Sequence, residues 1–332
     1  MSLAVAVRRR AGVHPMLSLL ARRSASGVLT LLVVSIIVFL ATQALPGNAA
    51  YATLGRQAGN PQRLHALERQ MHLNRPAIVQ YWSWLSGLLT GHLGKSLATG
   101  KPIWTNVGPR LANSATLMVI AGLIGTLLGV GLGALAALRK DGAFDHALGV
   151  VSLAVTSLPS FVVAIVFIIV FATLLSHLFP AVSILAPGTY AWQQPKLLVL
   201  PVATLVTVIV PYIFRMTRAS MIEALESDYI EMARLKGMSA TRVLVVHALP
   251  NAIAPAIQVV GLSFLYLAGG IVVVEYIFNF PGIGQGLVNA VTARDVPTLQ
   301  FIVVVLAAFF VFVNILTDMV ALLATPRRRI PK

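Results

Sequence analysis

Residues 111–138 read LANSATLMVIAGLIGTLLGVGLGALAAL and carry no charged side chain. A membrane-spanning helix needs roughly 20 mostly apolar residues, so this stretch is long enough to cross a bilayer. Comparable apolar runs occupy residues 27–45, 147–175, 197–214, 253–278 and 299–324. The sequence therefore predicts an all-α, polytopic membrane protein with about six transmembrane helices.

Glycines and prolines within these runs predict how the helices pack and where they break. Gly125, Gly129 and Gly133 are four residues apart. This spacing predicts a flat strip where another helix backbone approaches closely, although glycine is also simply tolerated in lipid. Pro159 and Pro211 are expected to bend or break their helices, either as plain kinks or as the broken helices that line transporter cavities.

The composition excludes a soluble globule. The 332 residues are 58% hydrophobic and only 11% charged, whereas a soluble domain carries about 25% charged residues. A net charge of +15 would suggest nucleic-acid binding in a soluble protein. Here the basic residues stand between apolar runs, which is typical of loops that orient membrane helices. The absence of cysteine excludes disulfides, thiolate metal sites and thiol nucleophiles.

Basic residues predict the orientation in the membrane. They concentrate before the first run, at Arg139 and Lys140, between Arg215 and Arg242, and after the last run. By the positive-inside rule these segments are cytoplasmic. The predicted parts are then a cytoplasmic N-terminal segment (1–26), a first transmembrane helix (27–45), an extracytoplasmic loop (46–110) and a basic cytoplasmic tail (325–332). A cleaved signal peptide is the alternative for the first run.

The long loop 46–110 contains two predicted helices. Asn60 and Pro61 form a helix start, followed by Leu64, Leu67 and Met71 at helical spacing. Pro76 starts a second stretch with one apolar face. That face carries Ile78, Tyr81, Trp82, Leu85, Leu88 and Leu89. Such helices either lie on the membrane surface or pack on the helix bundle as a small cap.

Few residues offer chemistry. Glu275 and Asp318 lie near the ends of the fifth and sixth runs, where each acid is expected to be hydrated or paired, with a transport-coupling role as the alternative. His65 and His72 have no acidic third ligand beside them, so no metal site is predicted. No sequence matches a phosphate-binding P-loop. We therefore predict no catalytic residue, and ATP hydrolysis would require another subunit.

The apolar pattern stops between residues 215 and 250. A helix over 219–235, a glycine stop at Gly237 and a capping Ser239 predict a helical hairpin. A short helix over 240–248, ended by Leu249 and Pro250, would follow. Val243, Leu244 and His247 share one face of that short helix. The hairpin fits either a groove on another protein or an ordinary solvated loop.

The residues of this hairpin resemble a known motif. Residues 231–233 (EMA), Gly237 and, after nine intervening residues, 247–250 (HALP) are similar to the EAA loop of ABC importer permeases; Met232 and His247 depart from its usual residues. Other segments of the chain resemble dipeptide and oligopeptide permeases of the B type, although His92 and Asn48 stand where those permeases often have Asp. The segments are 45–47 (LPG), 73–76 (LNRP), 80–85 (QYWSWL), 91–96 (GHLGKS) and 275–284 (EYIFNFPGIG).

This resemblance implies a type I ABC importer permease fold, with a five-helix core over 111–324 that includes the EAA loop 215–250. It implies a bacterial plasma-membrane complex with a second permease, two ATPases that bind ATP and magnesium, and an extracytoplasmic binding protein. The chain itself would hold no cofactor and would not be an enzyme. The implied ATPase-coupling residues are Glu231, Ala233, Gly237, Ser239, Val243, Leu244, His247, Leu249 and Pro250.

The implied substrates are di- and oligopeptides, with nickel, glutathione or haem as the alternatives known in the same family. The substrate-binding residues cannot be assigned from the sequence. Two other classes compete with the importer permease. An ion-coupled secondary transporter would need a coupling-ion site, and a membrane-embedded enzyme would need clustered Asp, His or Ser at one depth.

Overall fold

The computed structural model describes residues 15–44, 60–62, 65, 74–175, 179–186 and 189–324. Within these residues every regular element is a helix. The expected tail 325–332 and the spacing of Leu64, Leu67 and Met71 lie outside them. The elements are α1 (Pro15–Gln43), α4 (Ala77–Leu89), α5 (Ile103–Leu138), α6 (Ala143–Thr156), α7 (Ser160–Phe167), the π-helix η2 (Ile168–Leu174), the 3₁₀ turns η3 (Ala191–Gln193) and η4 (Pro195–Leu197), α8 (Val199–Leu225), α9 (Asp228–Leu235), α10 (Ala240–Arg242), the π-helix η5 (Val243–Ala248), α11 (Leu249–Ile277), α12 (Ile283–Thr292) and α13 (Val296–Ala324).

Five of the described helices are long and apolar enough to cross a membrane: α1, α5, α8, α11 and α13. A sixth span is formed if α6 and the α7–η2 helix are counted together, and these two bend by 103° at their break. Pro159 stands at that break with an extended backbone, so the expected interruption at this proline is confirmed. The prediction of about six spans is confirmed, because the described helices give five spans, or six with the bent pair counted as one.

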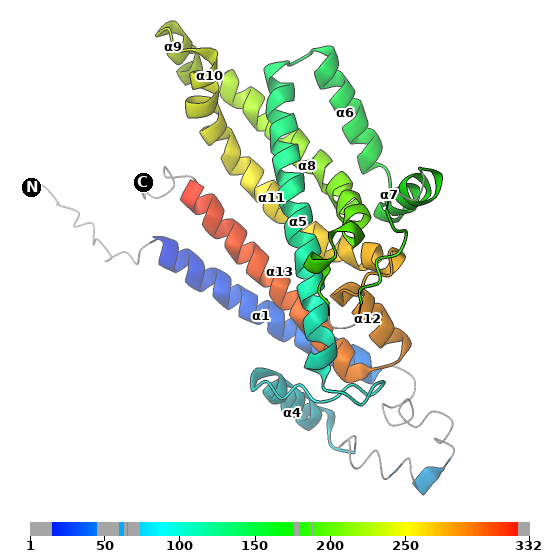
Figure 1. The fold of residues 1–332 in the computed structure, drawn as a ribbon. Helices are drawn as coiled ribbons and strands as arrows, with labels where there is room; N and C mark the ends of the chain where they lie inside the picture. The colour runs from blue at the N-terminus through cyan, green and yellow to red at the C-terminus, as the bar shows by residue number, and fades with distance from the viewer. Residues whose placement is uncertain are drawn as a thin grey trace, which may run out of the picture.

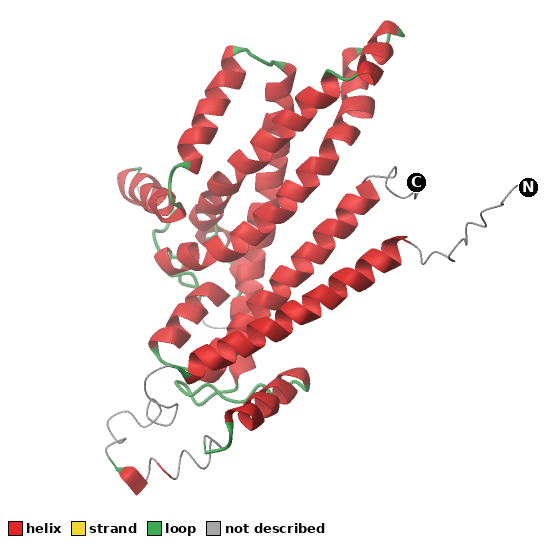
Figure 2. Cartoon of the chain, turned by 180° about the vertical axis from the view of Figure 1, so that it is seen from behind, coloured by secondary structure: helices red, strands yellow, loops and turns green. Residues whose placement is uncertain are grey.

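The helices form two groups (Figure 1). α8 lies between α5 and α11, and α1 lies against α13, which also packs on α11. The α5–α6 turn and the α9–α10 segment project at one end of the bundle, whereas α4 and α12 lie toward the other (Figures 1 and 2). The first residues of α1 and the last residues of α13 lie on the same side in both views.

The glycine strip of α5 packs closely against α8. Gly125, Gly129 and Gly133 are all buried. A Cβ on Gly129 would lie 2.7 Å from Cβ of Ile213, and one on Gly133 would lie 2.7 Å from the backbone oxygen of Phe214. The expected packing role of these glycines is confirmed, because α8 fills the space that side chains would need.

Two helices extend beyond the predicted spans on either side of this contact. The helix of the fourth span continues without interruption through Pro211 to Leu225, past the apolar run that ends at residue 214. Pro211 is buried, and packing of α8 between α5 and α11 offsets the one backbone hydrogen bond that this proline cannot donate. The helix of the second span begins at Ile103, before the apolar run that starts at residue 111.

The second loop helix begins as expected, since Pro76 immediately precedes α4. Tyr81 and Leu85 are buried against Phe39 of α1, whereas Ile78, Trp82 and Leu89 are exposed. Part of the predicted apolar face therefore packs on the bundle and part does not. At the other predicted start, the Asn60 side-chain oxygen accepts the Gln62 backbone N–H at 3.0 Å.

The glycine contact predicts the effect of a single methyl group. Gly129→Ala would force a Cβ into Ile213, so we expect it to lower the free energy of unfolding by about 1–3 kcal/mol. Gly131→Ala is the matched control, because Gly131 is exposed and its added Cβ would meet nothing within 4 Å. The control should be neutral, or more stable by up to about 1 kcal/mol. Thermal unfolding in detergent measures both, and equal stability of the two variants would contradict the close contact.

Candidate functional site

The α9–η5 hairpin stands at the projecting end of α8 and α11 (Figure 1). The expected helix over 219–235 is interrupted, because α8 ends at Leu225 and α9 starts at Asp228. The Ser227 hydroxyl donates to the Ala224 carbonyl at 2.5 Å and Ser227 itself is extended, which favours a helix start over a continuing helix. The glycine stop is confirmed: Gly237 has φ +75°, a conformation that costs glycine nothing.

The second half of the hairpin differs from the prediction. Ser239 precedes α10, and its carbonyl accepts the Val243 N–H at 3.0 Å. Beyond α10 the chain is π-helical over Val243–Ala248 and runs directly into α11. The prediction that Leu249 and Pro250 end a separate helix was therefore wrong. Pro250 occupies the first turn of α11, where a missing backbone N–H costs least.

A buried apolar cluster fixes the hairpin to the bundle, and we call it the hairpin core. It joins residues of α5, α8, α9, η5 and α11. Its members are Ala137, Met221, Ala224, Ile230, Ala233, Val243, Ala248 and Ala252. Leu244 and Leu249 pack against it. The hairpin is thus a packed extension of the bundle rather than a free loop.

Exposure divides the hairpin into an inward and an outward face. Val243 is only 2% exposed and faces the hairpin core with Leu244, and His247 is half-buried. These three residues are less exposed than Val245 and Val246 between them, so the expected shared face is present and turns toward the bundle. Glu231, Gly237, Ser239 and Pro250 are exposed, and Ala233 is buried. The exposed large apolar side chains are Tyr229, Met232, Leu235, Val245 and Val246.

Two ion pairs tie the α5–α6 turn to the end of α8. Arg218 forms a two-pronged pair with Asp145, in which Nη2 donates to Oδ2 at 2.6 Å, and Asp145 is buried. Lys140 pairs with Glu226, and this hydrogen bond raises the pKa of the Lys140 ammonium. The Arg218 pair is the stronger constraint, because exposed pairs such as Lys140–Glu226 contribute little.

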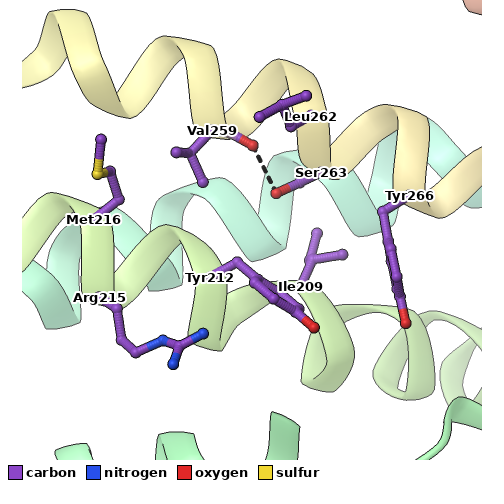
Figure 3. Close-up of a pocket in the computed structure, with 8 residues that line it drawn as sticks. All are labelled: Ile209, Tyr212, Arg215, Met216, Val259, Leu262, Ser263 and Tyr266. Carbon is purple, nitrogen blue, oxygen red and sulfur yellow. Dashed lines mark hydrogen bonds between the residues drawn. The ribbon is translucent and has the colours of Figure 1, made fainter.

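A groove opens between α8 and α11, with a volume of about 620 Å³ (Figure 3). Its aromatic wall is the pair Tyr212 and Tyr266, whose ring centroids are 5.8 Å apart. The Arg215 guanidinium lies 5.6 Å from the Tyr212 ring, within range of a cation–π contact. The Ser263 hydroxyl donates to the Val259 carbonyl at 2.8 Å. The remaining lining residues are Ile209, Met216 and Leu262. The sequence did not reveal this lining, because it requires knowing which faces of two helices meet.

Comparison with known proteins identifies the family. Residues 129–330 match the binding-protein-dependent transport system inner membrane component, and residues 16–120 match its N-terminal region. The chain belongs to this family. A dipeptide transport system permease of Alkalihalophilus pseudofirmus is 35% identical, over 94% of this chain and 99% of the relative. A glutathione transport system permease of Escherichia coli is 31% identical, over 95% of this chain and 99% of that relative.

The permease fold is also found among solved structures. An inward-facing structure of the MetNI methionine ABC transporter superposes with a TM-score of 0.56 at 14% identity, covering 68% of this chain and 98% of that one. The predicted all-α, type I permease fold is confirmed. The chain is thus a multi-pass membrane permease component of an ABC transporter.

The permease buries one acid that the sequence placed near an interface. Glu275 is fully buried. Its carboxylate accepts the Ser114 hydroxyl at 2.5 Å, the Gly284 N–H at 2.7 Å and the Gln285 N–H at 3.2 Å. Glu275 therefore caps the start of α12 and joins it to α5 and α11, since the first N–H groups of a helix lack partners of their own. The other acid, Asp318, pairs with Arg23 at 2.7 Å, as expected.

No group of three potential metal ligands occurs within the described residues. The histidine pair considered from the sequence cannot be assessed, because His72 lies outside those residues.

Truncation of Glu275 tests its capping role. Glu275→Ala removes the acceptor for a hydroxyl and two backbone N–H groups, so we expect it to lower the free energy of unfolding by about 2–4 kcal/mol. Glu275→Gln retains one side-chain oxygen, so its loss of unfolding free energy should be about half that of Glu275→Ala. Thermal unfolding of the purified permease in detergent compares the melting temperatures of the two variants with that of the unchanged chain. Unchanged melting of the alanine variant would contradict the network.

Proposed function

We propose that this chain is the transmembrane permease subunit of an ATP-driven importer of di- or oligopeptides in a bacterial plasma membrane. The observation that carries the proposal is the hairpin: a packed projection at the end of two membrane helices, with exposed apolar side chains. The chain has no P-loop of its own, so the energy of ATP enters through another protein. Both termini and the hairpin lie in the cytoplasm, where that protein is.

The proposed complex contains this permease, a second permease of the same fold, two cytoplasmic ATPases and an extracytoplasmic binding protein. ATP and magnesium are bound by the ATPases, and this chain contributes no cofactor and no catalytic residue. The exposed strip of Met232, Leu235, Val245 and Val246 supplies apolar contact for an ATPase surface. Exposed Glu231 and Lys236 in the same hairpin supply polar contacts.

The connection between hairpin and groove gives a mechanism. α8 and α11 enter the hairpin from its two sides, and the same helices form the groove (Figures 1 and 3). The hairpin core holds Met221 and Ala224 of α8 together with Ala252 of α11. A rotation of the hairpin imposed by the ATPases therefore moves both groove walls, which is a two-state change driven by a ligand bound elsewhere.

The groove chemistry supports a peptide substrate. Tyr212, Tyr266 and Leu262 offer apolar and aromatic contact for side chains, and the Arg215 guanidinium suits a carboxylate. The relative named for dipeptide transport is 35% identical, whereas nickel, glutathione and haem remain alternative cargoes of the family. An ion-coupled transporter is less well supported, because Glu275 and Asp318 are already held by protein partners.

Crosslinking tests the hairpin as the ATPase contact. The chain contains no cysteine, so single cysteines report one position each. Val246→Cys, carrying a photoactivated maleimide in membranes with the complete transporter, should crosslink to a subunit that also labels with an ATP analogue, because Val246 is exposed. Val243→Cys is the matched control, since Val243 is buried and should not react. Failure of Val246→Cys to capture an ATP-binding subunit would contradict the proposed contact.

Substitution of Gly237 tests coupling. Val at φ +75° is strained by about 1–2 kcal/mol, so Gly237→Val should tilt or loosen the hairpin and reduce uptake of a labelled dipeptide at equal expression. Gly237→Asn should retain most uptake, because Asn tolerates this conformation. Uptake is compared in a strain that lacks the native gene, with labelled nickel as a second cargo. Normal uptake by the valine variant would refute the coupling role, and uptake of nickel alone would refute the peptide assignment.

A further inference from the structure

We propose that α4 is a membrane-surface helix whose exposed apolar strip, formed by Ile78, Trp82 and Leu89, lies in lipid at the face of the bilayer opposite the hairpin. The proposal concerns the loop before α5 and does not depend on the transported substrate.

Contacts with α1 set the depth of α4. The hydroxyls of Tyr81 and Ser35 are hydrogen bonded at 2.8 Å. The rings of Tyr81 and Phe39 meet edge to face, with centroids 5.4 Å apart. Ser35 lies eight residues before the end of α1 at Gln43, which is about 12 Å along a helix. α4 is therefore beside the apolar span of α1 rather than beyond its end.

The surface of α4 divides into three sectors. At 100° per residue, Tyr81, Leu85 and Leu88 form one sector, which packs on the rest of the chain. Ile78, Trp82 and Leu89 form the next sector and are 62%, 58% and 79% exposed. Ser83, Ser86 and Thr90 form the third sector, which is exposed and mainly polar, with Val79 as its one apolar side chain. Such an arrangement suits an element with protein on one side, lipid on another and water on the third.

α1 also carries exposed apolar side chains next to its contact with α4. Ile36 and Leu40 follow the two α1 residues that contact α4, so they lie on the adjacent side of that helix, and they are 44% and 57% exposed. α1 is one of the helices apolar enough to span a membrane, so Ile36 and Leu40 meet lipid on the helix against which α4 packs. Tryptophan at the edge of the α4 strip matches the preference of this side chain for the membrane interface.

Spin labels distinguish lipid from water and from protein. In the otherwise cysteine-free chain, Ile78→Cys, Leu89→Cys and the control Ser83→Cys each carry one nitroxide. The complete transporter is reconstituted in phosphatidylcholine–phosphatidylglycerol vesicles. We expect the labels at 78 and 89 to collide more with oxygen than with a water-soluble nickel chelate, and the label at 83 to show the reverse.

The other outcomes overturn the proposal. A preference of labels 78 and 89 for the nickel chelate would place the strip in water. Protection of both labels from oxygen and from the chelate would mean that a protein covers it. All three substitutions are at exposed positions, so the fold should persist, and uptake by each variant confirms that it does.

Discussion

The close approach of α5 and α8 is the constraint on which the arrangement of the other helices depends. Lipid is as apolar as a leucine side chain, so burial of apolar side chains does not by itself drive membrane helices together. Their association depends instead on dispersion contact between surfaces that fit closely. The glycine strip provides such a surface, because Gly125, Gly129 and Gly133 present backbone to α8. Each partner then positions other parts: α8 carries the hairpin and one wall of the groove, and α5 carries Ser114, which holds α12.

Buried polar links add the specificity that apolar contact lacks. Glu275 joins α11 to α5 and α12, and Asp145 joins α6 to α8. Asp295, at the start of α13, accepts hydrogen bonds from Ser96 at 2.5 Å and from the Leu97 N–H at 3.0 Å. The Gln300 amide donates to the Thr42 hydroxyl at 2.7 Å and links α13 to α1. A helix that slid by one turn would leave these groups unpaired away from water, which is costly.

Apolar runs, glycine spacing and proline positions were sufficient to predict the spans, the α5 packing strip and the break at Pro159, because each depends on local sequence and on the bilayer. The failures have a different origin. Continuation of α8 through Pro211 and burial of Glu275 depend on partners far away in the chain. The first turns of α5 were missed because Arg110 looks like a loop residue, yet it donates to the Gly282 carbonyl at 3.3 Å and the Gln285 side chain at 3.2 Å.

The π-helical stretch η5 connects the hairpin directly to α11. The spacing of residues 243, 244 and 247 predicts one shared face, and Val243 and Leu244 turn that face toward the hairpin core, whereas Val245 and Val246 face outward. The same stretch removes the break expected before α11. The chain is continuous helix from η5 through Pro255 to Val259, where the groove begins. A separate helix ending at Pro250 would have placed a non-helical joint between the hairpin and the groove, and the observed connection avoids that joint.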